Sequence, residues 1–275
     1  MAAHNRHDYR KIVRRIYLLL PFTLLKQKLA WRLRKPPSGL PDFLGIGVQK
    51  AGTTWLYDQL QLQPEVQLAR VKEVHYFDWF FHRPLKWYLS QFGEAKGKVR
   101  GEITPGYSII ERGRIKFLKR IKHDLRLILI LRDPRYRAWS AARFHYGTVL
   151  GRDLKDVSAQ QYIDYLRQSW VKQRGDYTTI IQNWKSVFPE DQLLILYNED
   201  IASDPYEELC RVCAFLGTAV PVKNDRLSER PNKSKEAGIP SEVARYLENQ
   251  YTADVLQLEG LLNRKLDAWR VQISD

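Results

Sequence analysis

A lysine, a glycine and two threonines lie close together in the stretch FLGIGVQKAGTTWLYDQL. Lys50 carries a positive charge, and Gly52 permits a tight turn. Thr53 and Thr54 add hydroxyl donors. An apolar run precedes these residues and a helical pattern follows them, so their backbone N–H groups come at the start of a helix, where anions bind. The pattern predicts a site for a phosphate-like anion.

The order of these residues differs from that of the loop that binds nucleoside triphosphates. That loop follows G-x-x-x-x-G-K-[ST], with the lysine directly after the second glycine. Here Lys50 comes two residues before Gly52, with Ala51 between them. An ordinary strand–turn–helix connection would explain the glycine, but it would not explain the lysine and both threonines as well.

A second polar group follows another apolar run, in LILILRDPRYRAWS. Arg132 comes directly after an expected strand over residues 125–131, and Ser140 follows about two helical turns later, which predicts a second phosphate site. Asp133 followed by Pro134 is typical of a helix N-cap with proline at the first position, so we expect Asp133 to be structural. Because an arginine stands where a nucleotide kinase or NTPase has its magnesium-binding aspartate, an anion bound without a metal is favoured over that alternative.

The elements that position these groups alternate between strand and helix. We expect strands over 43–48, 99–102, 125–131 and 192–197, and helices over 53–63, 109–122, 135–146, 177–188, 206–216 and from Ser241 onward. Near-continuous apolar runs are typical of parallel strands that are buried on both faces. The alternation predicts a three-layer α/β fold, similar to that of P-loop proteins, around a central parallel sheet. Ligands of such sheets bind at the carboxyl ends of the strands, where both polar groups fall.

We expect residues 1–40 to be a basic amphipathic helical segment with a linker, and residues 41–275 to be one domain. The uncharged run over 16–25 is too short to span a bilayer. Pro21 and the lack of a small-residue cleavage site argue against a secretory signal. Residues 1–35 are therefore expected to form an interfacial helix, on a membrane or on another subunit, or a helix packed on the domain itself.

The chain has 275 residues and a net charge of +14, which favours an anionic partner. Its basic residues are spread along the chain and not gathered in one motif, so we do not expect nucleic acid as the partner. The alternative to an enzyme is a non-enzymatic module that binds nucleic acid or an anionic glycan. The only two cysteines, Cys210 and Cys213, lie in a helical pattern and lack a second pair to complete a zinc site. Their expected role is structural, in a reducing, cytoplasmic compartment.

Together the two polar groups resemble the motifs of sulfotransferases that use 3′-phosphoadenosine 5′-phosphosulfate (PAPS). QKAGTTWL resembles the loop that binds the 5′-phosphosulfate, and LRDPRYRAWS resembles the 3′-phosphate motif R-D-P-x-x-R-x-x-S. The motifs come in the family's order and spacing, and the resemblance covers about residues 43–240. It implies that Lys50 and residues 51–54 bind the 5′-phosphosulfate, and that Arg132 and Ser140 bind the 3′-phosphate.

The resemblance also implies contacts with the rest of the nucleotide. Trp55 matches a residue that stacks on adenine, and Tyr197, in LYNED, matches a further adenine contact. RPNKSKEAGIP occupies the region where the family places a second 3′-phosphate clamp, which makes Arg230, Lys233 and Lys235 candidates. A solvated basic loop is the alternative for that region.

The segment KEVHYFDWFFHRPLKWYLSQF resembles the heparan sulfate branch of the family, in which a glutamate acts as general base on the acceptor. That glutamate matches Glu73. His75 comes two residues later, on the same side of an extended chain, so either is a candidate base, and a polar surface loop is the alternative. The branch has a lysine where GEITPGYS has Ile103.

The resemblance implies in-line transfer of a sulfuryl group to a hydroxyl or amine, without a metal. The aromatic-rich segments around residues 75–92 favour a carbohydrate acceptor, since aromatic rings commonly lie against sugar faces. Small alcohols, lipid-linked sugars and protein tyrosines are the alternatives.

Overall fold

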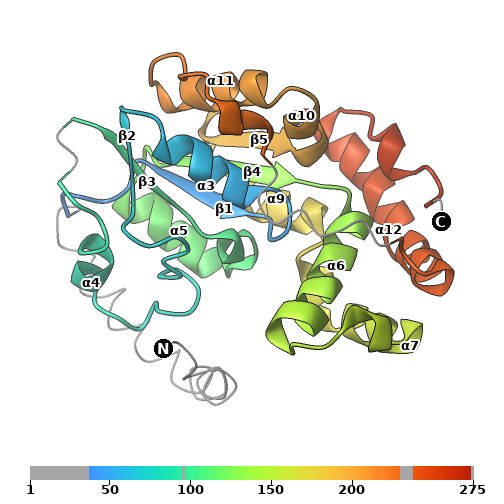
Figure 1. Cartoon of the computed structure of the whole chain (residues 1–275). Coiled ribbons are helices and arrows are strands. Elements are labelled where there is room, and N and C mark those ends of the chain that lie inside the picture. Colours follow the sequence, from blue (N-terminus) through green and yellow to red (C-terminus); the bar gives the residue numbers. More distant parts are fainter. Residues whose placement is uncertain (1–36, 95–96, 230–237, 274–275) are drawn as a thin grey trace.

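The computed structural model describes residues 37–94, 97–229 and 238–273, so the expected N-terminal helix over 1–35 lies outside the described residues. In the described part, helices surround a single five-stranded sheet (Figure 1). No helix in these ranges combines the length and the apolar character needed to cross a membrane.

The sheet is parallel throughout, in the strand order β2-β3-β1-β4-β5. Its strands are β1 Phe43–Gly47, β2 Val66–Leu68, β3 Val99–Ile103, β4 Arg126–Leu131 and β5 Leu193–Tyr197. Every residue of β1, and every residue of β4 after Arg126, is buried, because helices cover both faces of the sheet. The predicted α/β class with a central parallel sheet is confirmed.

Helices α3 and α11 cover one face of the sheet, and α5 and α9 cover the other (Figure 1). The α-helices are α3 Thr53–Gln61, α4 Leu85–Leu89, α5 Arg112–Ile121, α6 Pro134–Arg143, α7 Ala159–Leu166, α8 Ser169–Gln173, α9 Tyr177–Lys185, α10 Asn198–Ser203, α11 Pro205–Leu216 and α12 Ser241–Leu262. Shorter 3₁₀ or π-helical segments are η1 Pro105–Ile109, η2 Phe144–Val149, η3 Leu154–Asp156, η4 Glu190–Gln192, η5 Asp225–Ser228 and η6 Asp267–Trp269.

A second apolar cluster lies beside the sheet, where α6 packs on α7 and α12 (Figure 1). Within it the rings of Trp139 and Tyr162 meet edge to face, with centroids 4.7 Å apart. Leu247 and Tyr251 of α12 are buried in the same cluster. This packing fixes the direction in which α6 leaves the sheet, and α6 carries the candidate phosphate ligand Ser140.

Local signals at the element ends are confirmed. The Asp133 side chain accepts the N–H of Arg135 and caps α6, with Pro134 at the first helical position. Cys213 is buried on α11 and is not disulfide-bonded, as expected for a structural residue. The expected helix over 135–146 is confirmed, but it is α-helical only to Arg143 and continues to Val149 as the π-helical turn η2.

Candidate active site

The anion loop joins β1 to α3 and is held by residues from two other strand ends. Lys50 has a φ of 72° and Gly52, the N-cap of α3, has a φ of 104°. Arg132, directly after β4, donates from Nη1 to the carbonyl of Lys50 at 3.2 Å. Asn198, directly after β5, donates from Nδ2 to the carbonyl of Ala51 at 3.1 Å. Only glycine suits position 52, since a Cβ there would lie 2.9 Å from the Asn198 amide nitrogen in a left-handed backbone.

The Lys50 ammonium lies near Arg132 and near Lys72 and Glu73, which belong to the segment between β2 and α4. Its Nζ is 4.4 Å from the ring centroid of Phe144, at the start of η2. Burial lowers the pKa of Lys50, the Arg132 and Lys72 charges lower it further, and the Glu73 carboxylate opposes them. An anion bound beside Nζ would favour the charged form of Lys50, the form that binds phosphate.

Lys72 links the anion loop to the predicted base. Its Nζ donates to Thr54 Oγ1 at 2.6 Å and lies 3.9 Å from Glu73 Oε1. The loop's other threonine, Thr53, is buried. The sequence analysis did not single out Lys72, although its position directly before the matched glutamate was a usable signal.

Glu73 and His75 converge, as predicted, but the reason given for it was wrong. Their backbone is not extended, because both residues have positive φ, 61° and 55°. The His75 ring lies between two carboxylates, with Nε2 3.5 Å from Glu73 Oε2 and Nδ1 2.8 Å from Asp78 Oδ2. Asp78, which the sequence analysis missed, was detectable as the acidic residue three positions after the histidine.

The two carboxylates determine the charge of this group. Burial by itself would lower the pKa of His75, but its hydrogen bonds to Asp78 and Glu73 outweigh burial and raise that pKa to about 9. The hydrogen bond from His75 lowers the pKa of Glu73, against burial, and the Lys72 charge adds to this. Near neutral pH the imidazole is therefore protonated and Glu73 is ionised, so Glu73 is the group able to accept a proton.

Two exposed aromatic rings lie beside these charges. Trp79 is 42% exposed and stacks on His75, with centroids 3.8 Å apart and planes 6° from parallel. Phe144 is 41% exposed and lies under the Lys50 ammonium. Rings of this kind next to a candidate base suit a flat or partly apolar acceptor.

The predicted 3′-phosphate ligands lie on the β4–α6 connection. The carbonyl of Arg132 accepts the hydroxyl of Tyr177 at 2.8 Å, and the N–H of Asp133 donates to Glu199 Oε1 at 3.0 Å. Ser140 is half-buried on α6. Arg132 thus touches the anion loop directly, whereas Ser140 lies about two turns along α6, and their shared role at a 3′-phosphate stays a prediction.

The predicted adenine contacts occupy different surroundings. Trp55 is only 4% exposed, and its Nε1 donates to the carbonyl of Leu227 at 3.0 Å. Tyr197 ends β5, and the Arg264 guanidinium lies over its ring, 3.7 Å from the centroid. Both roles stay predictions.

The second phosphate clamp falls outside the described residues, which omit Arg230, Lys233 and Lys235. Ile103, in place of the lysine of the heparan sulfate branch, lies in the core at 1% exposure. It packs so closely on Gly45 that a Cβ at position 45 would lie 2.7 Å from it.

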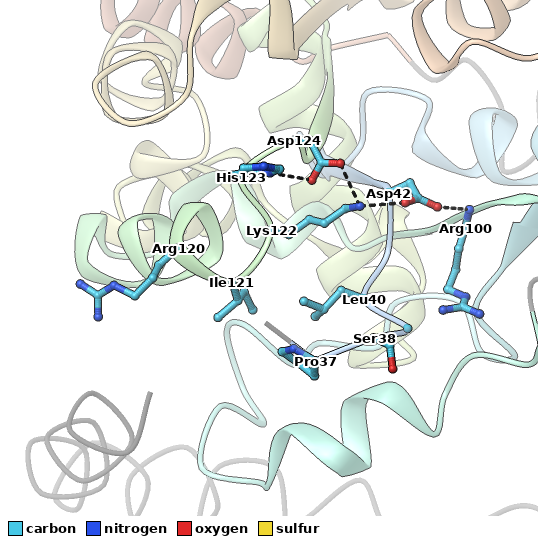
Figure 2. A pocket seen from close by; sticks show the side chains of 11 residues that line it. Pro37, Ser38, Leu40, Asp42, Arg100, Arg120, Ile121, Lys122, His123 and Asp124 are labelled. Atoms are coloured by element: carbon cyan, nitrogen blue, oxygen red, sulfur yellow. Dashed lines mark hydrogen bonds and ion pairs between the residues drawn. The ribbon is translucent and has the colours of Figure 1, made fainter. Parts of the chain in front are cut away.

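A cavity of about 430 Å³ lies at the amino ends of strands β1, β3 and β4, opposite the carboxyl ends that carry the candidate site (Figure 2). Its lining includes Asp42, before β1, and Arg100, near the start of β3. Lys122, before β4, spans Asp42 at 3.0 Å and Asp124 at 3.2 Å, so its charge is already paired. Because these residues lie before or at the start of their strands, the cavity is separate from the site at the carboxyl ends. In the part of the chain that the structure describes, no three His, Cys, Asp or Glu side chains are grouped to hold a metal ion.

The anion loop follows β1 of a parallel sheet, and Arg132 from the end of the neighbouring strand β4 contacts it. With the pair of Glu73 and His75 nearby, this arrangement defines an α/β protein with a candidate anion site at the carboxyl ends of its strands. The family comparison agrees, since the model of the sulfotransferase domain matches residues 40–237. The chain belongs to the sulfotransferase family.

Similar sequences include heparan sulfate glucosamine 3-O-sulfotransferases. The mouse 3B1 protein is 32% identical over 187 residues, which are 65% of this chain and 46% of that protein. Human heparan sulfate glucosamine 3-O-sulfotransferase 6 is 30% identical over 184 residues, 64% of this chain and 52% of that protein. The chain thus matches about half the length of these curated relatives.

Solved structures share the fold. The crystal structure of a sulfotransferase from Alicyclobacillus acidocaldarius superposes with a TM-score of 0.69, covering 84% of this chain and 99% of that one at 22% identity. At that identity the likeness concerns the arrangement of sheet and helices.

Proposed function

We propose that this protein transfers the sulfuryl group of PAPS to a hydroxyl group of a carbohydrate. The observation that carries the proposal is the contact between the anion loop and the segment of Glu73: Lys72 donates to Thr54 Oγ1 of the loop at 2.6 Å and lies 3.9 Å from Glu73 Oε1. In agreement with this proximity, the charges of Lys50 and Glu73 shift each other's pKa. This proximity supports a site in which a cation faces the leaving phosphate and a carboxylate faces the acceptor.

The reaction is an in-line displacement at sulfur. The acceptor oxygen forms a bond to sulfur and loses its proton to Glu73, while the bond from sulfur to the bridging oxygen of the 5′-phosphate breaks. The leaving group is 3′-phosphoadenosine 5′-phosphate (PAP). Lys50 and the N–H groups at the start of α3 stabilise the charge that grows on the bridging oxygen, the kind of preorganised electrostatics that lowers such barriers most.

His75 has a supporting role in this scheme. As an imidazolium between Glu73 and Asp78, it orients the Glu73 carboxylate and keeps it ionised. A base with a lowered pKa is sufficient, because the acceptor proton becomes acidic as the O–S bond forms. When the phosphate of PAPS pairs with Lys50, the lysine charge stabilises the Glu73 carboxylate less. The pKa of Glu73 therefore rises at the moment of transfer.

The carbohydrate acceptor is supported by two features. The relatives described above act, by their names, on the glucosamine of heparan sulfate. Trp79 and Phe144 offer exposed ring faces beside the base and the lysine, and sugars commonly lie against such faces.

PAP should raise the melting temperature of the protein, whereas ATP with Mg²⁺ should not. The expected reason is that the family motif provides for a 3′-phosphate through Arg132 and Ser140, a group that ATP lacks. With PAP at about 100 times its Kd the added stability is about 2.7 kcal/mol, which is readily measured by differential scanning fluorimetry. Stabilisation by ATP–Mg²⁺ alone would instead indicate a nucleotide kinase or NTPase.

Radiolabelled PAPS should label a glycan in preference to the other acceptor classes. The screen presents de-sulfated heparan sulfate fragments, small alcohols, lipid-linked sugars and tyrosine peptides under equal conditions, with the Lys50→Met variant as the blank. Transfer to a glycan hydroxyl supports the proposed acceptor. Faster transfer to tyrosine or to a simple alcohol would replace it while leaving the sulfotransferase assignment intact.

A further inference from the structure

Glu102, in β3, is buried, and three hydroxyl groups donate to it, two of which also contact the base segment, residues 73–78. Tyr88 and Tyr107 both donate to its Oε1, at 2.7 Å and 2.9 Å. Thr104 donates to its Oε2 at 2.7 Å. Burial raises the pKa of Glu102, and the three hydroxyl donors act against burial by favouring the carboxylate. Nothing in the proposed chemistry uses this carboxylate, so its role must lie elsewhere.

The Tyr107 hydroxyl also accepts a backbone N–H from the base segment. Tyr76, the residue after His75, donates its N–H to Tyr107 Oη at 2.8 Å. The N–H of His75 approaches Thr104 Oγ1 at the longer distance of 3.5 Å. A hydroxyl group has one proton, and both of these hydroxyls donate theirs in a hydrogen bond to Glu102. Their oxygen lone pairs are therefore left to accept the N–H groups of the base segment.

The base segment needs such support because of its backbone. Glu73 and His75 both adopt the left-handed region, which costs non-glycine residues free energy and persists only where the surroundings hold it. Arg114 of α5 donates to the carbonyls of Phe77 and Asp78, at 2.9 Å and 2.6 Å. Those bonds hold the segment after Tyr76, and Lys72 ties its start to Thr54. Tyr107 and Thr104 contact the N–H groups of Tyr76 and His75 between these two anchors.

The turn that carries Tyr107 also shapes the histidine pair. Gly106, in η1, lies directly against the Asp78 carboxylate, so that a Cβ at position 106 would collide with Asp78 Oδ2 and lie 3.5 Å from His75 Cε1. Gly106 does not have a positive φ, so alanine fits its backbone. The absence of a side chain here lets Asp78 reach His75.

We propose that Tyr107 and Gly106 are positioning residues, which hold Glu73 and His75 in their working geometry through the Glu102 hydroxyl network and the close packing of η1. The inference rests on the proposed function for the meaning of that geometry. The geometry itself is measurable without an acceptor, because the two carboxylates around His75 set its titration.

Tyr107→Phe and Tyr88→Phe form a matched pair that tests this role. Both rings are fully buried and both hydroxyls donate to the same oxygen of Glu102, but only the Tyr107 hydroxyl holds the base segment. Each variant should lose a similar few degrees in melting temperature, about 2–4 °C. Only Tyr107→Phe should lower kcat, about tenfold, with PAP affinity unchanged.

The decisive readout is the titration of His75, which is measured by NMR on both the PAP-bound protein and the free protein. His75 should titrate near pH 9 in the wild type and in Tyr88→Phe, and at least one unit lower in Tyr107→Phe. Gly106→Ala, which deletes no hydrogen-bonding group itself, should lower the pKa of His75 as well by pushing Asp78 away from His75. A His75→Gln spectrum assigns the signal.

Unchanged His75 titration in both Tyr107→Phe and Gly106→Ala would overturn the positioning role, and so would equal effects of Tyr107→Phe and Tyr88→Phe. Failure of the proposed function has a different signature. The wild type would then neither bind PAP nor form it from PAPS, while the His75 titration would still differ between the variants and the wild type. If Tyr107→Phe does not fold, Gly106→Ala carries the test with the same criteria.

Discussion

Lys50→Met is expected to lower kcat for sulfuryl transfer by about 10²–10³-fold, the range found when one electrostatic donor to a developing oxyanion is removed. Lys50 lies between β1 and α3 with a left-handed backbone. In the absence of an anion, burial and the Arg132 charge disfavour its charged form. Its attraction for the bridging oxygen grows as the S–O bond breaks, so the loss should fall on kcat more than on PAP affinity. Methionine keeps an unbranched side chain as far as Cε and removes the ammonium, which lies 4.4 Å from the Phe144 ring centroid.

The measurement pairs initial rates of transfer from radiolabelled PAPS with calorimetric binding of PAP. Lys116→Met, at an exposed lysine on α5, is the control for the loss of one positive charge and should behave as wild type. A kcat for Lys50→Met near that of wild type would remove the lysine from the chemistry. A loss confined to PAP affinity would assign it to binding alone.

The sequence predicted most of the sheet because its strands are long, apolar and followed by polar residues with defined chemistry. The strands ending before Val48, Arg132 and Asn198 were all found, within two residues at each end. β2 was missed because three residues give no periodicity to detect. The helices α7 and α8 were missed because they pack on α6 and α12 and not on the sheet, so they lie outside the strand–helix alternation that guided the prediction.

The location of a candidate residue was predictable where it depends on the distance in sequence from a strand or helix end. Lys50, Arg132 and Asp133 belong to that class. The contacts of Glu102 were not predictable, because they join residues of β3, α4 and η1 that only the folded chain brings together. Nor could the sequence show that Glu73 and His75 are left-handed, since nothing but tertiary support makes that conformation available to them.

Glu73→Gln is expected to lower kcat by about 10²–10⁴-fold, the usual contribution of a general base. Glutamine keeps the shape of the side chain and can still contact His75, but it cannot accept the proton of the acceptor. His75→Gln should cost less, because His75 is protonated near neutral pH and orients Glu73 without taking a proton itself. Rates at saturating PAPS, with melting curves for both variants, provide the comparison. A larger loss for His75→Gln than for Glu73→Gln would reverse the two roles.

The pH dependence of the wild-type rate separates the two assignments by its sign. If Glu73 is the base, its lowered pKa keeps it ionised through the neutral range, and the rate falls as the pH rises through about 9, where His75 loses the proton that holds Glu73 in place. If His75 is the base, only its neutral form is active, and the rate rises through the same pH. In His75→Gln the alkaline limb should disappear, which ties that limb to His75 and not to the acceptor or to Lys50. A rising limb would move the proton transfer to His75 and leave Glu73 as the residue that positions it.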